Sequence, residues 1–256
     1  MERAENDNLF KICYDNISIA DTKESGYDSP KKFSPEERGK MNISIRKEEP
    51  RDYRKVEELT RKAFWNLHSP GCDEHYLVHV MRGHADFIPE LDLVMELDGA
   101  VIGNIMYTLS KLKSESGREK SVLTFGPVSV APEFQRKGFG KKLIEHSFGI
   151  ARKLGHEMIV IFGNPGNYLG LGFKSCRRFN IGLGIDMYPT AMLVKELVER
   201  DPGSEKWVYM GSPVYEIDKA GAGVFDSEFE PLKKEFRPSQ EEFFILSNSR
   251  IITDSI

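Results

Sequence analysis

The sequence predicts an α/β fold, and three observations support this assignment. Residues 91–97 and 100–109 are apolar runs separated by an Asp-Gly dipeptide at 98–99, which favours the type I′ turn of a tight hairpin. Residues 122–130 are predicted to be the third strand of this meander. A glycine-rich turn then leads into an amphipathic helix and a short, fully apolar strand at 158–162, as expected for a strand covered on both faces.

A strand and two helices are expected before the meander. Residues 42–46 alternate apolar and polar side chains, as a half-buried strand does. Apolar residues recur at helical spacing over 53–64 and again over 73–82. A third helix begins after the glycine turn and ends at Gly155, which is expected to form its C-cap. The residues that this third helix is expected to bury are Phe139, Leu143, Phe148, Ala151 and Leu154.

Three other segments have a less regular pattern. Residues 111–121 are polar and contain Gly117, so they are expected to form the loop between two strands of the meander. Residues 190–198 and 207–211 contain strand-like and helix-like pieces that would complete the sheet and its last helix.

The two ends of the chain differ from the central domain, which we place at residues 41–211. Residues 1–40 are rich in Asp, Lys, Ser, Asn and Glu, with one apolar patch at 9–14, and they predict a polar N-terminal extension. Residues 212–256 are a C-terminal extension interrupted by the apolar run 243–246. This run is either a strand packed on the domain or an edge used for self-association, which would give a homodimer.

Composition excludes several classes of protein. The 256 residues carry a net charge of -4, which gives no global attraction to nucleic acid. The three cysteines, Cys13, Cys72 and Cys176, form no Cys-x-x-Cys pair, so neither a disulfide scaffold nor a zinc ribbon is indicated. The first residues lack the apolar core of a signal peptide, and no run approaches the roughly 18 apolar residues of a membrane span. A cytoplasmic location without membrane contact is expected.

The turn at residues 135–140 is the most informative feature. It follows a strand and opens a helix, so unpaired backbone amides lie at the positive end of a helix dipole, which suits a pyrophosphate. A Walker loop would need glycine where Gln135 stands, and Ser or Thr where Lys142 stands. A dinucleotide fingerprint would need a third glycine at Leu143. Both alternatives therefore fail on spacing.

Two motifs in this region resemble those of a known family. The run Val-Ser-Val-Ala-Pro-Glu-Phe-Gln-Arg-Lys-Gly-Phe-Gly at 128–140 resembles the acyl-CoA-binding motif of the GCN5-related N-acetyltransferases, the GNAT superfamily. Residues 163–173 resemble the second motif of that superfamily, in which Tyr168 stands four residues before a Gly-Phe pair. The Gly-Asn-Pro run before Tyr168 is similar to a subgroup of small bacterial acetyltransferases with a Gly-Asp/Asn-Pro variant of this motif.

The resemblance implies the GNAT fold, a mixed and mostly antiparallel twisted sheet flanked by helices, with a splayed central pair of strands. The Gly-Pro pair at 126–127 favours a bulge there, since proline removes a ladder donor. Backbone amides beyond it would bind the pantetheine arm of acetyl-CoA, and those of the turn would bind its pyrophosphate. The cofactor-binding residues carried over are Val128, Ser129, Val130, Gln135, Arg136, Lys137, Gly138, Phe139, Gly140, Lys141 and Asn164.

Other interpretations stay open for the polar residues of both motifs. Arg136 and Lys137 either contact phosphate or belong to a solvated turn. Asn164 either hydrogen-bonds the pantetheine, as the resemblance suggests, or is a plain turn residue before Pro165.

Tyr168 is the candidate general acid. The resemblance implies that its hydroxyl lies near the thioester sulfur, and a phenol with a pKa of about 10 stays protonated at neutral pH. Its alternatives are a tyrosine packed under the sulfur without proton transfer, or a core aromatic with a satisfied hydroxyl. Glu96 stands where some relatives carry a base, but we interpret it as an outward charge beside Asp98, and water relays can replace a carboxylate.

Histidines cluster around the second predicted helix. His75 and His79 share a helical face at one turn's separation, a spacing that can ligate zinc. The Glu of His-Glu-x-x-His is absent and acidic residues surround the pair, so a solvated face is the favoured interpretation and no metal is expected. The resemblance places this segment beside the acceptor cleft, which makes His79 and Tyr76 candidate acceptor contacts.

The resemblance therefore implies an acetyl-CoA-dependent N-acetyltransferase at residues 41–211, with acetyl-CoA as co-substrate. Transfer would be direct, without a covalent enzyme intermediate, to a primary amine of a small molecule or a protein. The alternative from another class is a CoA-binding regulatory or scaffold module without turnover. A second alternative is an acyl group longer than acetyl.

Overall fold

A computed structural model of the chain describes residues 42–199 and 203–252. The N-terminal extension expected at residues 1–40, with its apolar patch at 9–14, lies outside the described residues. Within the described ranges, none of the helices combines the length and apolarity that a bilayer crossing requires.

The elements follow the predicted order of strands and helices. The strands are β1 (Ile43–Lys47), β2 (Leu93–Leu97), β3 (Ala100–Ser114), β4 (Glu119–Val130), β5 (Met158–Phe162), β6 (Lys174–Ser175), β7 (Ile181–Gly182), β8 (Tyr188–Pro189), β9 (Met192–Glu196), β10 (Trp207–Met210) and β11 (Arg250–Ile251). The α-helices are α3 (Tyr53–Phe64), α4 (Glu74–Met81), α5 (Phe139–Lys153), α6 (Pro165–Tyr168), α7 (Lys219–Asp226) and α8 (Pro238–Ser247).

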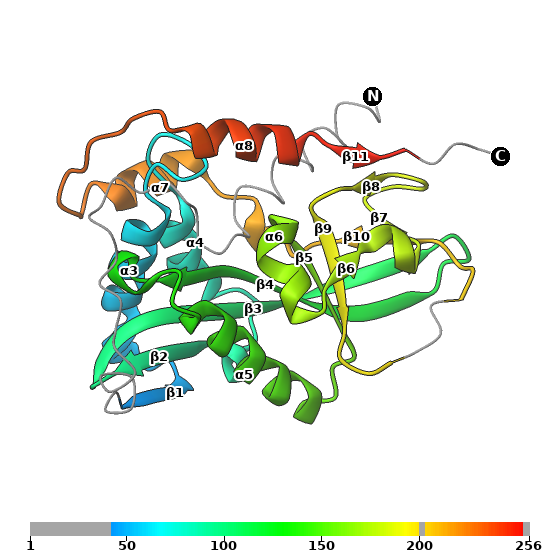
Figure 1. Ribbon diagram of the computed structural model, residues 1–256, viewed down its shortest axis with the longest axis horizontal. Helices are drawn as coiled ribbons and strands as arrows, with labels where there is room; N and C mark the ends of the chain where they lie inside the picture. Colours follow the sequence, from blue (N-terminus) through cyan, green and yellow to red (C-terminus); the bar gives the residue numbers. More distant parts are fainter. Residues whose placement is uncertain (1–41, 200–202, 253–256) are drawn as a thin grey trace.

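The strands form one mixed and mostly antiparallel sheet, as expected (Figure 1). Its order is β1-β2-β3-β4-β5-β9-β6, and β10 pairs with the far end of β3 and with β7. The pairs from β1 to β4 and those of β5, β9 and β6 are antiparallel, whereas β4 and β5 are parallel because α5 connects them. A small second sheet joins β8 to β11.

The two faces of the sheet are covered by different helices. A side chain at Gly103 would contact Leu143 of α5, and the Tyr107 hydroxyl lies 2.6 Å from that of Ser147 on the same helix. The opposite face carries Ser129, whose hydroxyl lies 2.8 Å from that of Thr60 on α3. The alternation of strand side chains thus puts α5 on one face and α3 on the other.

Several local predictions are confirmed by the backbone. Asp98 and Gly99 both have positive φ, of 51° and 83°, as a type I′ turn requires. Gly155 has a φ of 84° directly after α5, as expected at a helix C-terminus. The expectation for Leu154 is wrong, because this side chain is 43% exposed just beyond the last helical residue.

The prediction of a loop over residues 111–121 is also wrong in extent, because β3 ends at Ser114 and β4 begins at Glu119. The hairpin of β3 and β4 continues to the pair Lys113 and Glu119, so strand covers most of this polar stretch. Its outer edge is paired as well, since Trp207 of β10 lies opposite Ser114. The polar side chains of this segment do not indicate a strand, although its backbone is paired on both edges. The pairing partner on the outer edge, β10, is about ninety residues away in the sequence.

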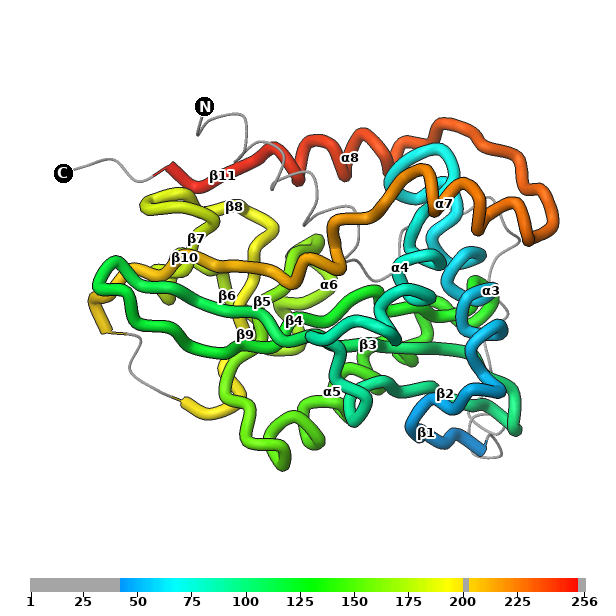
Figure 2. The backbone as a smooth tube through the Cα atoms, turned by 180° about the vertical axis from the view of Figure 1, so that it is seen from behind, coloured from blue at the N-terminus to red at the C-terminus, as the bar shows by residue number. Residues whose placement is uncertain are grey.

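The apolar run at residues 243–246 is neither the packed strand nor the strand edge that was expected. It lies in α8, which begins at Pro238, a favourable residue for the first turn of a helix. Figures 1 and 2 show α8 along one side of the molecule, from α7 at one end to β8 at the other. The C-terminal segment is tied to the α3–α4 loop by Trp65 and Asn66, whose side chains both donate to the Lys233 carbonyl oxygen at 2.9 Å.

Helix α7 covers α4 and buries His75, contrary to the solvated face expected for this histidine. The ring is fully buried and lies against Phe225 and Phe229, with ring centroids 5.5 and 5.1 Å away. Its Nε2 atom lies 3.2 Å from Oδ1 of Asp226, and its Nδ1 atom 3.5 Å from Sγ of Cys72. Burial lowers the pKa of His75 to about 4, although the Asp226 carboxylate opposes this change.

The buried histidine predicts an acid-sensitive fold. Between pH 6.5 and 4 the unfolded chain binds a proton at His75 that the folded chain does not, so stability falls as the pH is lowered through this window. We expect a loss of roughly 3 kcal/mol by pH 4 from this group. Urea unfolding at a series of pH values measures this loss. In His75→Asn the free energy of unfolding should depend less steeply on pH. The exposed control His146→Asn should retain the pH dependence of the unmodified chain; equal slopes for His75→Asn and the unmodified chain would contradict the assignment.

Candidate active site

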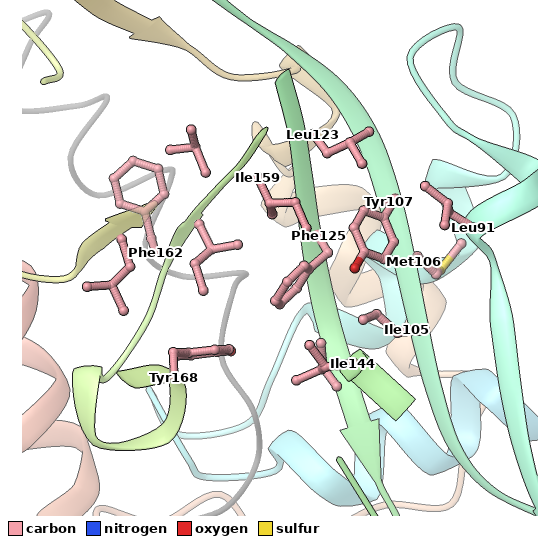
Figure 3. Packing of buried hydrophobic residues seen from close by; sticks show 14 of the residues in the cluster. Leu91, Ile105, Met106, Tyr107, Leu123, Phe125, Ile144, Ile159, Phe162 and Tyr168 are labelled. Carbon is pink, nitrogen blue, oxygen red and sulfur yellow. The ribbon is translucent and has the colours of Figure 1, made fainter. Parts of the chain in front are cut away.

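The central feature is the point at which β5 parts from β4. The parallel pairing of β4 with β5 is found near the start of β5, where Leu123 lies opposite Ile159. By contrast, β5 pairs with β9 along its whole length, from Met158 to Phe162. A bulge at the Gly-Pro pair of β4 shifts the register with β3 between Ile105 and Tyr107. The bulge and the splayed pair were both expected, and Figure 3 shows the two strands diverging beyond Ile159.

The open edge of β4 presents backbone groups to this gap. The amide of Ala131 donates to the carbonyl oxygen of Ile102 on β3 at 2.9 Å. Because successive amides of a strand point to opposite edges, those of Val128 and Val130 point away from β3, toward the side of β5. The Val130 carbonyl oxygen confirms this orientation, since it accepts from the side chain of Gln135 at 3.0 Å rather than from β3.

The glycine turn follows directly and opens α5. Gly138 is the N-cap residue, with a φ of 86° that favours glycine. Arg136 is also left-handed, with a φ of 59°. The amides of Phe139, Gly140 and Lys141 form the first helical turn, where no backbone acceptor is available within the helix. The turn therefore has the donor geometry and the dipole of an anion site.

Side chains of the turn have several different roles. Gln135 fastens the turn to the end of β4 through Val130. The Nζ atom of Lys137 donates to the Glu133 carbonyl oxygen at 2.7 Å, and partial burial lowers its pKa. Lys141 is exposed and lies 3.7 Å from Glu145 one turn along α5.

Two other predicted cofactor residues are buried. The side chain of Ser129 faces α3 through its contact with Thr60, and that of Phe139 is 8% exposed and packs edge-on against Phe134. Both residues have their side chains in the core, so only their backbone groups are available to a ligand.

Tyr168 lies at the end of α6, close to where the strands part (Figure 3). It is fully buried, with ring centroids 6.0 Å from Phe125 and 5.6 Å from Phe173. A side chain at Gly163 would lie 2.5 Å from the Tyr168 ring, so glycine there permits this packing. The ring is thus packed among core aromatic side chains, and both the acid role and the role of the hydroxyl stay predictions.

Asn164 caps α6 and also contacts the C-terminal extension. Its Oδ1 atom accepts from the Gly166 amide at 2.9 Å, and its Nδ2 atom donates to Oε1 of Glu242 at 2.8 Å. The side chain thus has the turn role considered for it and a tie to α8 in addition. Contact with a pantetheine stays a prediction.

The remaining candidates from the sequence lie outside this gap. Glu96 forms an ion pair with Arg46 at 2.6 Å on the β1–β2 edge, and the hydrogen bond from Arg46 lowers the carboxyl pKa. His79 is half exposed, and its ring stacks on Tyr76. Within residues 42–199 and 203–252, no three His, Cys, Asp or Glu side chains are grouped as metal ligands.

Sequence reasoning missed a groove beside the gap. It has a volume of about 710 Å³ and lies between the end of β5 and α8. Its lining residues are Asn164, Thr190, Phe236, Pro238, Glu241, Glu242, Ile245, Leu246 and Ser249. A hint is present in the sequence, because two glutamates directly precede the apolar run at 243–246.

Comparisons with known proteins agree with this geometry. The Acetyltransferase (GNAT) family matches residues 54–168. The uncharacterized N-acetyltransferase YjhQ of Escherichia coli is 28% identical over 88 residues, 34% of this chain and 48% of YjhQ, so the match spans about half of that relative.

Two solved structures share the fold. A GNAT family acetyltransferase from Brucella melitensis, in complex with acetyl-CoA, has a TM-score of 0.54 and 25% identity, over 68% of this chain and 98% of that one. The GNAT family N-acetyltransferase YhbS of Escherichia coli, in complex with CoA, has a TM-score of 0.58 and 18% identity, over 69% of this chain and 93% of that one.

The parted parallel strands followed by a glycine turn define the class of fold as that of the N-acetyltransferases. The match of residues 54–168 to the acetyltransferase (GNAT) family agrees with this class of fold.

Gly163 provides a test of the packing at this site. In Gly163→Ala the added methyl group would meet the Tyr168 ring, so we expect a loss of about 1 to 3 kcal/mol in the free energy of unfolding. The control is Gly149→Ala in the middle of α5, where nothing lies within 4 Å of the added atom and a gain of about 0.5 to 1 kcal/mol is expected. Urea unfolding measures both; equal stability of the two variants would refute the close packing.

Proposed function

We propose that this protein is an acetyl-CoA-dependent N-acetyltransferase that transfers acetyl directly to a primary amine. The observation that carries the proposal is the gap between β4 and β5. The amides of Val128 and Val130 point toward it, and the glycine turn begins five residues after Val130. An amide-bearing pantetheine arm can pair with that open edge as an added strand, and the diphosphate can be bound at the start of α5.

The reaction needs few groups from the protein. The amine nitrogen attacks the thioester carbon, the carbon–sulfur bond breaks, and the CoA thiolate takes up a proton. A β4 amide at the gap would stabilise the negative charge that develops on the carbonyl oxygen. Tyr168 is proposed to protonate the leaving thiolate, and the amine loses its proton to water.

A thiol-release assay tests the whole proposal. The full chain is incubated with acetyl-CoA and a panel of primary amines, and free CoA thiol is measured against a reaction without amine. Release that depends on an amine supports the transferase. Saturable binding of acetyl-CoA without release on any amine would favour the regulatory or scaffold module. A homodimer, a cytoplasmic location and the length of the acyl chain stay predictions.

CoA binding should depend on the charge of the turn. Replacing Arg136 and Lys141 together by Gln removes two cations beside the proposed diphosphate, so we expect affinity to fall about tenfold at low salt. Isothermal titration with CoA measures it. The control Lys153→Gln removes a cation from the opposite end of α5 and should leave the affinity unchanged. Equal CoA affinities for the double variant and the unmodified chain would contradict the proposed contact of these two side chains with the diphosphate.

Tyr168→Phe tests the proposed acid. If the hydroxyl protonates the leaving thiolate, kcat should fall about a hundredfold, while the KM for acetyl-CoA changes little. The control Tyr209→Phe removes another buried hydroxyl, one that lies 2.6 Å from that of Thr124, and should leave kcat unchanged. An unaltered kcat in Tyr168→Phe would leave this tyrosine with its packing role alone.

A further inference from the structure

The groove between the core and α8 has one wall that belongs to the proposed reaction centre. Asn164 stands two residues after β5 and caps the helix that carries Tyr168. Thr190 lies beside it, since its neighbour Ala191 accepts from the amide of Gly163 at 2.9 Å. This wall therefore lies at the carboxyl end of β5, where the strand has parted from β4.

The other wall is α8, which is fastened to both sides of the groove. Glu242 accepts from Asn164 on the β5 side, and the amide of Thr190 donates to the Ser249 carbonyl oxygen at 3.0 Å. On the side of the α3–α4 loop, the Phe243 ring stacks on His68 with centroids 4.5 Å apart. Specific contacts with the core therefore hold α8 in place on both sides of the groove.

The chemistry of the lining favours a cation on an apolar body. The two charged residues of the lining are Glu241 and Glu242, and neither forms an ion pair with the described residues. Phe236 and Ile245 are 69% and 58% exposed, so apolar surface lies next to these carboxylates. A volume of about 710 Å³ is suited to a small organic molecule.

The hydroxyl group of Thr190 lies on the core side of the groove. Its hydroxyl oxygen is buried on the groove wall and makes no hydrogen bond with the residues that the structure describes. A buried polar group left in this way costs about 1 to 3 kcal/mol unless a ligand or water meets it. An ammonium group has three N–H donors, which suit the carboxylates of Glu241 and Glu242.

We propose that this groove binds the acceptor substrate, and that the acceptor is a primary amine carried by an apolar, aromatic-sized body and lacking a carboxylate. The inference rests on the proposed transferase function and defines its substrate class. The amine binds as the ammonium ion beside Glu241 and Glu242, and its apolar body contacts Phe236 and Ile245. A free amino acid with the same side chain is rejected, because its carboxylate would meet two like charges. An uncharged acyl chain would leave the negative charges of those carboxylates without a counter-charge.

The test is a titration of the CoA-saturated full chain with two matched ligands, 2-phenylethylamine and phenylalanine. They share the aromatic ring and the amine and differ by the carboxylate. We expect saturable binding of 2-phenylethylamine and at least tenfold weaker binding of phenylalanine.

A charge-neutral variant of the groove supplies the second arm of the test. In the double variant E241Q/E242Q, 2-phenylethylamine should bind about tenfold more weakly. The side-chain amide introduced in place of Glu242 retains a carbonyl oxygen that can still accept from Asn164, so the tie between α8 and the core is preserved. The control Glu90→Gln, an exposed carboxylate outside the groove, should bind the amine as the unmodified chain does.

The outcomes separate this inference from the proposed function. Absence of 2-phenylethylamine binding to the CoA-saturated chain, or equal affinity for the unmodified chain and E241Q/E242Q, overturns the groove assignment. Thiol release on a different amine would then still support the transferase. If CoA itself gives no saturable heat, the proposed function fails and the groove inference fails with it.

Discussion

The pairing of β5 with β9 is the interaction on which the site depends. Five consecutive residues of β5 lie opposite β9, whereas its parallel contact with β4 ends near Ile159. Because β5 pairs with β9, the amides on the open edge of β4 face no neighbouring strand of the described residues beyond the bulge. Hydrogen-bond donors that would normally close a sheet are therefore available to a ligand, and the glycine turn places further donors directly beyond them.

The C-terminal extension changes the surroundings of this shared framework. Helix α7 buries His75 on α4, and α8 passes over the end of β5 to meet β8 through β11. Helix α8 thus forms one wall of the groove beside the end of β5, and it carries two carboxylates and exposed apolar side chains there.

Agreement between sequence and structure was best where a local rule acts. The type I′ turn at Asp98 and the helix end at Gly155 depend on residues that tolerate positive φ, so each could be predicted from adjacent residues. The bulge in β4 follows from a proline that cannot donate to the ladder. The turn that opens α5 was recognisable because glycine and basic residues stand at a fixed spacing.

Failures arose where a distant segment altered a local pattern. Residues 111–121 are polar, but β10 pairs with their backbone and makes most of them strand. The sequence around His75 indicates a solvated residue, but α7 covers this side chain. The apolar run at 243–246 indicates a strand, but these residues are part of helix α8. Asn164 similarly acquired a partner, Glu242, at a separation of 78 residues.

The sequence by itself predicted the class of fold and the glycine turn that opens α5, because both depend on short-range patterns of glycine, proline and alternating apolar residues. The tertiary structure alone decided that α8 faces the end of β5, and therefore which carboxylates and aromatic side chain line the groove between them. That arrangement depends on contacts between segments far apart in the chain, such as Trp65 with Lys233 and His68 with Phe243, which leave no periodic trace in the sequence.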